Sequence, residues 1–336
     1  NSHHQLQQSY IHQKNVLSRF NNKNKSNFSN IILAGMGASG LAAEIVSDWL
    51  SNKINLPITT IKDPKLPNYI NENTLFLPVS KSGETMEVLK SVNDASKITQ
   101  NIISLSIHGQ LEKFSNSNDF IHLNIDYNPY SRTSTLALIG SLIAILDTFL
   151  DIESSEKLIT KTNHDLNNTQ KDLSINNPFS NNISKQSAKF ISDKNKEKSC
   201  IYVLSSQKLK TIGLRLVQQF NENSKISCFY SQVPDALHNT IVALDASNSG
   251  TLITIQSKND PKYIYSAFNE ITQVAQHQNL RIINILGNSD SILTEMLTTL
   301  LQVDYLSYYV SILNTVSPGP TILLDSLKEK LKNTFI

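Results

Sequence analysis

The sequence predicts an α/β protein built from two halves in tandem, each with a doubly wound parallel sheet. Three observations support this prediction. Short apolar runs alternate with helix-length segments, glycine- and serine-rich turns follow two of these runs, and the same rhythm resumes after a polar middle stretch. Strands that alternate with helices at this spacing form parallel sheets with right-handed crossovers.

The first half opens with a polar helix and an Asn/Lys-rich loop over residues 1–30. Beyond this segment, strands are expected at 31–34, 57–62, 74–79, 101–106 and 120–123, and helices at 39–52, 84–98, 109–115 and 133–150. Because the helix over 133–150 closes this half, we predict a first domain over residues 1–150.

The second half follows a connecting segment, residues 151–197, whose Asn/Ser/Lys-rich composition predicts a helix, a loop and a second helix. Further strands are expected at 200–204, 226–230, 251–255 and 281–286, and helices at 208–223, 261–278, 290–313 and 321–332. This half resembles a degenerate copy of the first, without its glycine-rich turn. We predict a second domain over residues 151–336.

Composition and charge exclude several functional classes. The 336 residues are enough for two domains, and a net charge of +2 leaves no basic footprint for nucleic acid. The longest apolar run, residues 136–146, is shorter than the ~20 residues that span a bilayer. Cys200 and Cys228 lie in apolar segments, which predicts buried free thiols in a reducing compartment. We therefore expect a soluble cytoplasmic protein that binds neither nucleic acid nor membrane.

The first glycine-rich turn, residues 35–40, reads Gly-Met-Gly-Ala-Ser-Gly and follows an apolar run. A strand, a tight turn and a helix start would leave the backbone N–H groups of Gly37, Ala38 and Ser39 free to bind an anion. The G-x-G-x-x-G spacing also fits a dinucleotide-binding fingerprint, with Asp63 where a ribose-binding acid is expected. This turn alone is compatible with either a nucleotide or a sugar phosphate.

The second turn, residues 80–85, reads Ser-Lys-Ser-Gly-Glu-Thr. It can be explained as a helix start in which Ser82 is the cap and Glu84 favours the positive end of the dipole. The same free donors suit a phosphate, and the hydroxyls of Ser80, Ser82 and Thr85 can converge on one. The dinucleotide hypothesis leaves this turn unexplained, so the two turns together favour a phosphosugar pocket.

These two motifs resemble the sugar isomerase (SIS) domain, and the chain as a whole resembles the bifunctional phosphoglucose/phosphomannose isomerases. The resemblance covers nearly all of the sequence. It implies two flavodoxin-like SIS domains in tandem, a homodimer, and hexose 6-phosphates as substrates. It also implies interconversion of glucose 6-phosphate, and of mannose 6-phosphate, with fructose 6-phosphate through a cis-enediol(ate). No cofactor is expected, and no metal, because the sequence lacks a His-rich ligand cluster.

The resemblance implies the identity of two catalytic residues in the second half. Residues 221–225 match the family's Asn-Glu-Asn-x-Lys motif, whose glutamate is the catalytic base, here Glu222. Residues 234–239 resemble Pro-Glu-x-x-His-Asn, with Asp235 in place of the glutamate. The histidine, here His238, assists ring opening and comes from the neighbouring subunit in the family.

Three further residues are implied by the same resemblance. Arg132 would stabilise the enediolate, although Ser131 stands where the family has a proline. Lys328, in the closing helix, would assist ring opening. Thr321 lies seven residues earlier on the same helical face, where a small side chain accompanies acceptance of both epimers.

Two alternative functions stay open at this point. One is an NAD-dependent oxidoreductase, which would use the glycine-rich fingerprint. The other is a non-catalytic phosphosugar-binding SIS protein, which would keep the two turns but would not need Glu222, His238 and Lys328 together. An amidotransferase of the glucosamine phosphate synthase type is disfavoured because no glutaminase domain is present.

Overall fold

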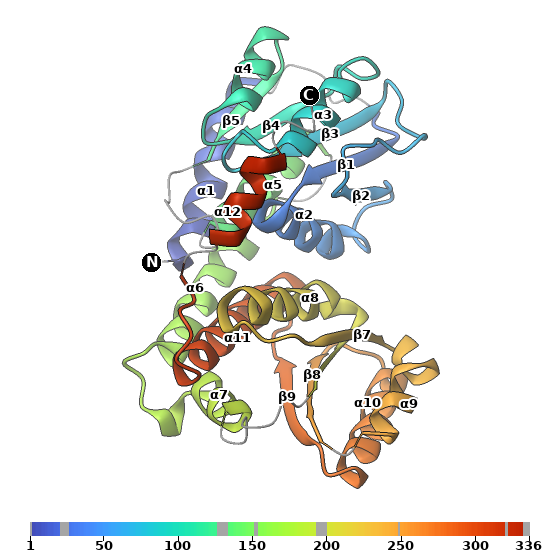
Figure 1. The fold of residues 1–336 in the computed structure, drawn as a ribbon. Helices are drawn as coiled ribbons and strands as arrows, with labels where there is room; N and C mark the ends of the chain where they lie inside the picture. Colours follow the sequence, from blue (N-terminus) through green and yellow to red (C-terminus); the bar gives the residue numbers. More distant parts are fainter. Residues whose placement is uncertain are drawn as a thin grey trace. The chain divides into compact units, whose positions relative to one another are not determined.

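The computed structural model describes residues 2–20, 27–125, 134–150, 154–192, 200–247, 249–319 and 322–331. The chain divides into two compact units, Asn1–His164 with Leu331–Ile336, and Asp165–Lys330 (Figure 1). Each unit is built around one parallel sheet, which confirms the predicted fold class. The units divide at residues 164 and 165, whereas the sequence placed the domain limits at 150 and 151.

The first sheet has the strand order β2-β1-β3-β4-β5, and its paired strands are all parallel. Its strands are β1 (Asn30–Gly35), β2 (Ile58–Ile61), β3 (Thr74–Val79), β4 (Ile103–Ser106) and β5 (Ile121–Asn124). Helices α1 (Ser2–Leu17), α2 (Gly37–Leu50), α3 (Met86–Ala95), α4 (Gln110–Ser117) and α5 (Thr135–Phe149) belong to this unit, with a 3₁₀ turn, η1 (Ser18–Phe20). Strand order reverses between β1 and β3, and ligands of open α/β sheets bind beside such a reversal.

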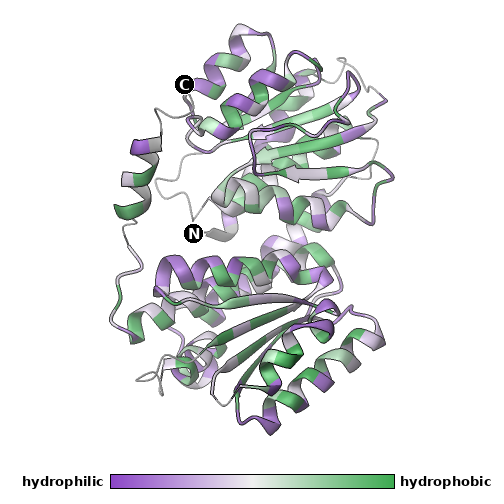
Figure 2. Ribbon diagram, turned by 45° about the vertical axis from the view of Figure 1, so that its right-hand side comes forward, coloured by the Kyte–Doolittle hydropathy of each residue, from purple (hydrophilic) through white to green (hydrophobic). Residues whose placement is uncertain are grey.

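The second sheet repeats this reversal in the order β7-β6-β8-β9. Its strands are β6 (Ile201–Ser206), β7 (Phe229–Val233), β8 (Thr251–Ser257) and β9 (Arg281–Gly287). The limit between the units falls inside helix α6 (Glu156–Leu173). The helices that follow are α7 (Ile183–Ser192), α8 (Lys210–Gln219), α9 (Thr240–Asp245), α10 (Lys262–His277), α11 (Ile292–Leu313) and α12 (Ile322–Leu331). The short turns are η3 (Phe179–Asn181), η4 (Gln207–Leu209), η5 (Phe220–Ser224) and η6 (Asp235–His238). Apolar residues concentrate on the central strands of both sheets (Figure 2). Strands β1, β3 and β6 are buried along their whole length, as expected for strands covered on both faces.

The amino-terminal helix α1 is polar in composition but buries one side in the first unit. Leu6, Tyr10 and Leu17 are buried, and the Tyr10 hydroxyl donates to Asp147 Oδ2 at 2.8 Å. The helix crosses α5 at Gly140, where an added Cβ would lie 2.2 Å from the Leu6 carbonyl oxygen. A glycine is therefore required for the two backbones to come this close.

Three local features of the second half differ from the prediction. Strand β7 covers 229–233 rather than 226–230, helix α8 ends at Gln219 and is followed by the π-helical turn η5, and helix α9 was not predicted. Both cysteines are free, but Cys200 is exposed and Cys228 is only half-buried. Each precedes its strand instead of lying inside it. Burial still raises the pKa of the Cys228 thiol to about 11.

Among the helices that the structure describes, none combines the length and the apolar character needed to cross a bilayer.

The close crossing of α1 and α5 makes Gly140→Ala a test of the first unit's packing. Alanine favours a helix by about 1 kcal/mol over glycine, but the 2.2 Å overlap must be relieved by moving α1. We expect a net loss of about 1–3 kcal/mol in the free energy of unfolding, measured by urea denaturation.

The matched control is Ser141→Ala, the next residue on α5, whose buried hydroxyl has no hydrogen-bond partner. This control should unfold at nearly the wild-type urea concentration. Equal stability of the Gly140→Ala variant and the wild type would contradict the close crossing.

Candidate active site

The turn after β1 brings backbone N–H groups to the carboxyl edge of the first sheet. Helix α2 begins at Gly37, and the N–H groups of Ser39 and Gly40 both donate to the Met36 carbonyl, at 3.0 and 3.2 Å. The N–H groups of Gly37 and Ala38 lie at the first helical positions, where a helix supplies no acceptor. At Gly40, an added Cβ would lie 2.5 Å from the Gly35 oxygen, so the turn has no room for a side chain.

The turn after β3 gathers hydroxyl groups at the same edge. Ser80 Oγ donates to Thr85 Oγ1 at 2.8 Å, and the Gly83 N–H donates to the Ser80 carbonyl at 2.9 Å. Gly83 has a φ of +69°, and an added Cβ would lie 1.7 Å from the His108 carbonyl oxygen. Ser82 does not cap the helix as predicted: its hydroxyl accepts from the Glu84 N–H at 3.2 Å, and α3 begins at Met86.

A hydrogen bond joins the two turns. The Lys81 N–H donates to Ser39 Oγ at 3.3 Å, and Ser39 is buried. Since β1 and β3 are neighbours, this bond places both turns together where the strand order reverses. The structure thus brings the predicted binding residues of the first unit to one place, next to a lysine to which sequence reasoning assigned no role. Partial burial lowers the pKa of the Lys81 ammonium group.

Asp63, the acid that the dinucleotide hypothesis requires, serves its own loop. Its Oδ1 atom accepts from the Lys65 N–H at 2.7 Å, which is the geometry of an Asx turn. The neighbouring Lys62 instead reaches back to α2 and pairs with Glu44 at 2.7 Å. The hydrogen bond of Asp63 within its own loop therefore explains its position without a ribose-binding role.

Glu222 lies in the π-helical turn η5 at the end of α8. The two residues after it, Asn223 and Ser224, are buried, whereas Glu222 is half-buried. The turn ends at Lys225, which has a φ of +56°, and the Lys225 ammonium group donates to the Glu222 carbonyl. The sequence placed Glu222 at a helix end correctly but gave no sign of π-helical winding.

His238 ends the 3₁₀ turn η6 and is exposed. The turn is held by Asn239, whose Nδ2 donates to Asp235 Oδ2 at 3.1 Å and whose Oδ1 accepts from the Thr240 N–H at 2.5 Å. Asn239 therefore caps α9, and Asp235, although shorter than the family's glutamate, still reaches it.

Glu222 and His238 lie at opposite ends of β7 within one chain. Helix α8 leads into η5 before this strand begins, and η6 follows directly after it. The strand has 5 residues, which corresponds to roughly 16 Å. A single unit therefore does not bring these two side chains onto one small ligand.

The other predicted residues are not fully described. Arg132 and Thr321 lie outside the residues that the structure describes. Lys328 lies in helix α12, of which only the backbone is described at this position.

In the second unit, a carboxylate fills the place that corresponds to the Ser80 turn. Glu295, fully buried on α11, accepts from Ser257 Oγ at 2.5 Å and from the Lys258 N–H at 2.9 Å, at the carboxyl end of β8. Gly287 makes room for it, because an added Cβ would lie 2.6 Å from Glu295 Cγ. The Glu295 side chain thus occupies the Ser257 hydroxyl and the Lys258 N–H, the donors that a bound phosphate would need at this position.

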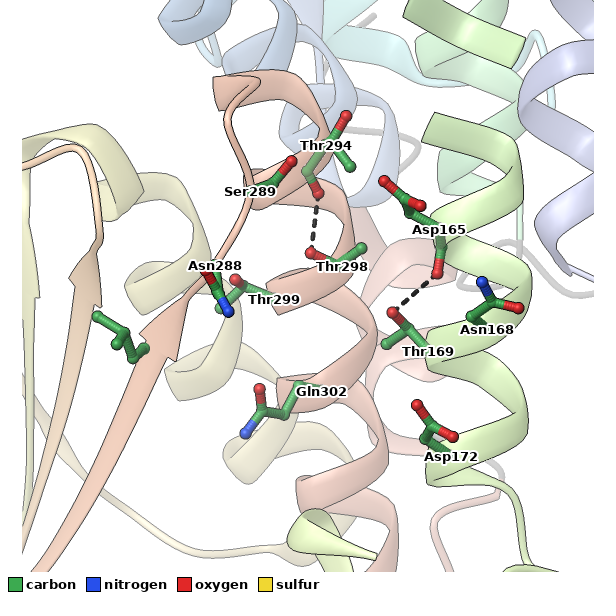
Figure 3. A pocket seen from close by; sticks show the side chains of 11 residues that line it. Asp165, Asn168, Thr169, Asp172, Asn288, Ser289, Thr294, Thr298, Thr299 and Gln302 are labelled. Carbon is green, nitrogen blue, oxygen red and sulfur yellow. Dashed lines mark hydrogen bonds between the residues drawn. The ribbon is translucent and has the colours of Figure 1, made fainter. Parts of the chain in front are cut away.

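A groove of about 310 Å³ in the second unit contains none of the predicted site residues. It lies between α6 and α11 and is lined by carboxylates such as Asp165 and Asp172 and by hydroxyls (Figure 3). Thr169 and Thr298 donate to carbonyl groups of their own helices. None of the described lining residues is cationic, so the groove does not suit a phosphate.

Two parallel sheets in tandem, each with a strand reversal and the first with paired turns beside it, define the class of fold, a tandem α/β protein that resembles SIS-domain proteins. A family model described as the bacterial phospho-glucose isomerase C-terminal SIS domain matches residues 181–331. Among solved structures, tagatose-6-phosphate ketose/aldose isomerase from Escherichia coli has a TM-score of 0.68 at 15% identity, covering 96% of this chain and 95% of that one. The C-terminal domain of glucosamine-fructose-6-phosphate aminotransferase from Francisella tularensis also has a TM-score of 0.68, at 13% identity, covering 95% and 96%.

Curated relatives make the identification more specific. The chain is 23% identical to the bifunctional phosphoglucose/phosphomannose isomerase of Thermoplasma volcanium, over 90% of this chain and 92% of the relative. The proteins of that name from Thermoplasma acidophilum and Caldicellulosiruptor bescii are 26% and 24% identical, over 90% and 97% of this chain and 90% and 96% of the relatives. The resemblance to the bifunctional phosphoglucose/phosphomannose isomerases is therefore confirmed.

The convergence of the two turns predicts that Thr85 contributes to phosphate binding. Thr85→Val keeps the shape of the side chain but removes the hydroxyl that bonds Ser80. Because a hydrogen bond to a charged group contributes about 1.5–3 kcal/mol, we expect the affinity for fructose 6-phosphate to fall by about tenfold or more. Isothermal titration calorimetry measures this loss.

Ser96→Ala serves as the control, since Ser96 follows the other end of α3 and its hydroxyl donates to the Asn93 carbonyl at 2.9 Å. Its affinity should match the wild type. Wild-type affinity in the Thr85→Val variant would remove Thr85 from the site.

Proposed function

We propose that this chain is an aldose–ketose isomerase that interconverts glucose 6-phosphate, and mannose 6-phosphate, with fructose 6-phosphate. The observation that carries the proposal is the hydrogen bond between Lys81 and Ser39, which joins two donor-rich turns at a strand reversal. The similarity to curated sugar phosphate isomerases over about nine-tenths of the chain supports the same class.

The first unit holds the phosphate group in this proposal. The N–H groups of Gly37 and Ala38 and the hydroxyls of Ser39, Ser82 and Thr85 supply neutral donors, and the start of α2 adds the positive end of its dipole. Ser80 orients the Thr85 hydroxyl, to which its own hydroxyl donates. Binding of the phosphate fixes the position of the sugar carbons in the site. Binding energy far from the reacting carbons is thereby used for their orientation.

The reaction needs an opened ring and a proton moved between C2 and C1 through a cis-enediol(ate). We assign proton transfer to Glu222, ring opening to His238 and Lys328, and stabilisation of the enediolate charge to Arg132. The enediolate has no stereochemistry at C2, so one base can serve both epimers. We propose that the small side chain of Thr321 leaves room for mannose 6-phosphate, which differs from glucose 6-phosphate at C2.

The position of Glu222 and His238 at opposite ends of β7 supports a site shared between two copies of the chain. In a homodimer, His238 of one subunit can approach the ligand that Glu222 of the other subunit contacts. We therefore propose a cytoplasmic homodimer in which each active site combines residues of both subunits.

Removal of the proposed base tests the chemistry directly. Glu222→Gln keeps the size of the side chain but cannot take the C2 proton, so we expect kcat to fall by about 10²–10⁴-fold while binding of fructose 6-phosphate is retained. Nuclear magnetic resonance in deuterated water should show no exchange at C2. Continued exchange at the wild-type rate would exclude Glu222 as the base.

A shared site predicts complementation between two inactive variants. When Glu222→Gln and His238→Ala proteins are mixed and refolded together, half of the dimers are mixed, and each of these contains one intact site. We expect recovery of about 25% of wild-type activity for random pairing. Refolding each variant alone is the control, and the absence of recovery from mixed dimers isolated with two affinity tags would contradict the shared site.

A further inference from the structure

The segment that carries Glu222 has an unusual winding. Residues 220–224 form a π-helical turn, which the Lys225 N–H closes by donating to the Phe220 carbonyl. The same carbonyl also accepts from the Ile226 N–H at 3.0 Å. A π turn holds one residue more than an α turn and is rare; it appears mostly as a single turn within an α-helix, and frequently at functional sites. A return to α-helical winding would rotate the residues that follow by about 100°. Something beyond the local backbone must therefore select this winding.

Ser307 of α11 contacts the two residues that follow Glu222. The Asn223 Nδ2 atom donates to Ser307 Oγ at 3.0 Å, and Ser224 Oγ donates to the Ser307 carbonyl at 2.7 Å. All three residues are buried, with exposed fractions of 8% for Asn223, 2% for Ser224 and 0% for Ser307. The side chains of two consecutive residues, Asn223 and Ser224, are thus both hydrogen-bonded to Ser307 of α11.

Asp304, one turn earlier on α11, holds the helix that leads into this turn. Arg215 donates to both of its carboxylate oxygens, Nε to Oδ1 at 2.8 Å and a terminal nitrogen to Oδ2 at 3.2 Å. Gln219 Nε2 donates to Oδ1 at 2.9 Å. Arg215 and Gln219 are buried, so these bonds fix both the rotation and the height of α8 against α11.

From these contacts we propose that Ser307 and Asp304 are positioning residues for Glu222. Asp304 fixes the end of α8, and Ser307 holds the π turn that follows. The hydrogen bonds of Asn223 and Ser224 to Ser307 thereby set the direction of the Glu222 side chain. This inference rests on the proposed function for the chemistry of Glu222. The positioning of the turn itself rests on the contacts alone.

The test compares two serines on the same helix. Ser307→Ala removes the acceptor for Asn223, whereas Ser311→Ala changes an equally buried serine whose hydroxyl donates to the Tyr308 carbonyl of its own helix. Ser307 makes the same kind of intrahelical bond, to the Asp304 carbonyl at 2.8 Å. The difference between the two variants therefore isolates the contact with η5.

In the Ser307→Ala variant we expect kcat to fall by about tenfold with KM changed by less than about twofold, because only the aim of the base is lost. Backbone amides of residues 220–226 should exchange faster with deuterated solvent, as measured by mass spectrometry. The Ser311→Ala variant should match the wild type in both measurements. Ser307→Thr, which keeps the hydroxyl, should recover most of kcat.

Equal kcat and equal amide exchange in the two alanine variants would overturn the proposal, even if both lower the melting temperature. A raised KM with unchanged kcat would also overturn it, since this pattern reports lost binding and not a misaimed base. If the wild-type chain shows no isomerase activity, the proposed function fails. Faster amide exchange in residues 220–226 of Ser307→Ala alone would then still support the positioning of η5, and its absence would refute it.

Discussion

The candidate site depends on one hydrogen bond, from the Lys81 N–H to the buried hydroxyl of Ser39. Parallel strands bring their carboxyl ends to one edge, and the reversal of order between β1 and β3 separates the helices that follow. The reversal alone leaves two independent turns. The Ser39 hydroxyl joins them, so that the start of α2 and the hydroxyls of the second turn lie side by side, as the proposed phosphate site requires.

The second unit has the same strand reversal but uses it differently. Its sheet has the corresponding order β7-β6-β8-β9. A Ser-Lys pair lies at the end of each corresponding strand, Ser257 and Lys258 at the end of β8 and Ser80 and Lys81 directly after β3. Here Glu295 accepts the hydrogen bonds that a ligand would otherwise accept. The same strand order thus carries the proposed phosphate site in one unit and an internal side-chain contact in the other.

Sequence reasoning succeeded where local chemistry dictates structure. Strand β3 was predicted at both ends because it is a buried apolar run, and the turn at residues 80–85 because its glycine and hydroxyls can be recognised directly. It failed where distant residues decide the outcome. The π turn η5 is held by Ser307, 84 residues from Asn223, and Glu295 lies 38 residues from Ser257. Neither partner stands in a motif, so no local pattern could have identified them.

Helix α11 connects the framework of the second unit to the segment that carries the proposed base Glu222. Its first turn contributes Glu295, which closes the turn after β8, and its middle contributes Asp304 and Ser307, which hold α8 and η5. Residues 295 and 307 are about 18 Å apart along the helix axis. A single rigid rod therefore fixes the Glu222 segment relative to the sheet, and any shift of α11 would be transmitted to the carboxylate. Polar contacts serve this purpose better than apolar packing, because hydrogen bonds specify direction as well as distance.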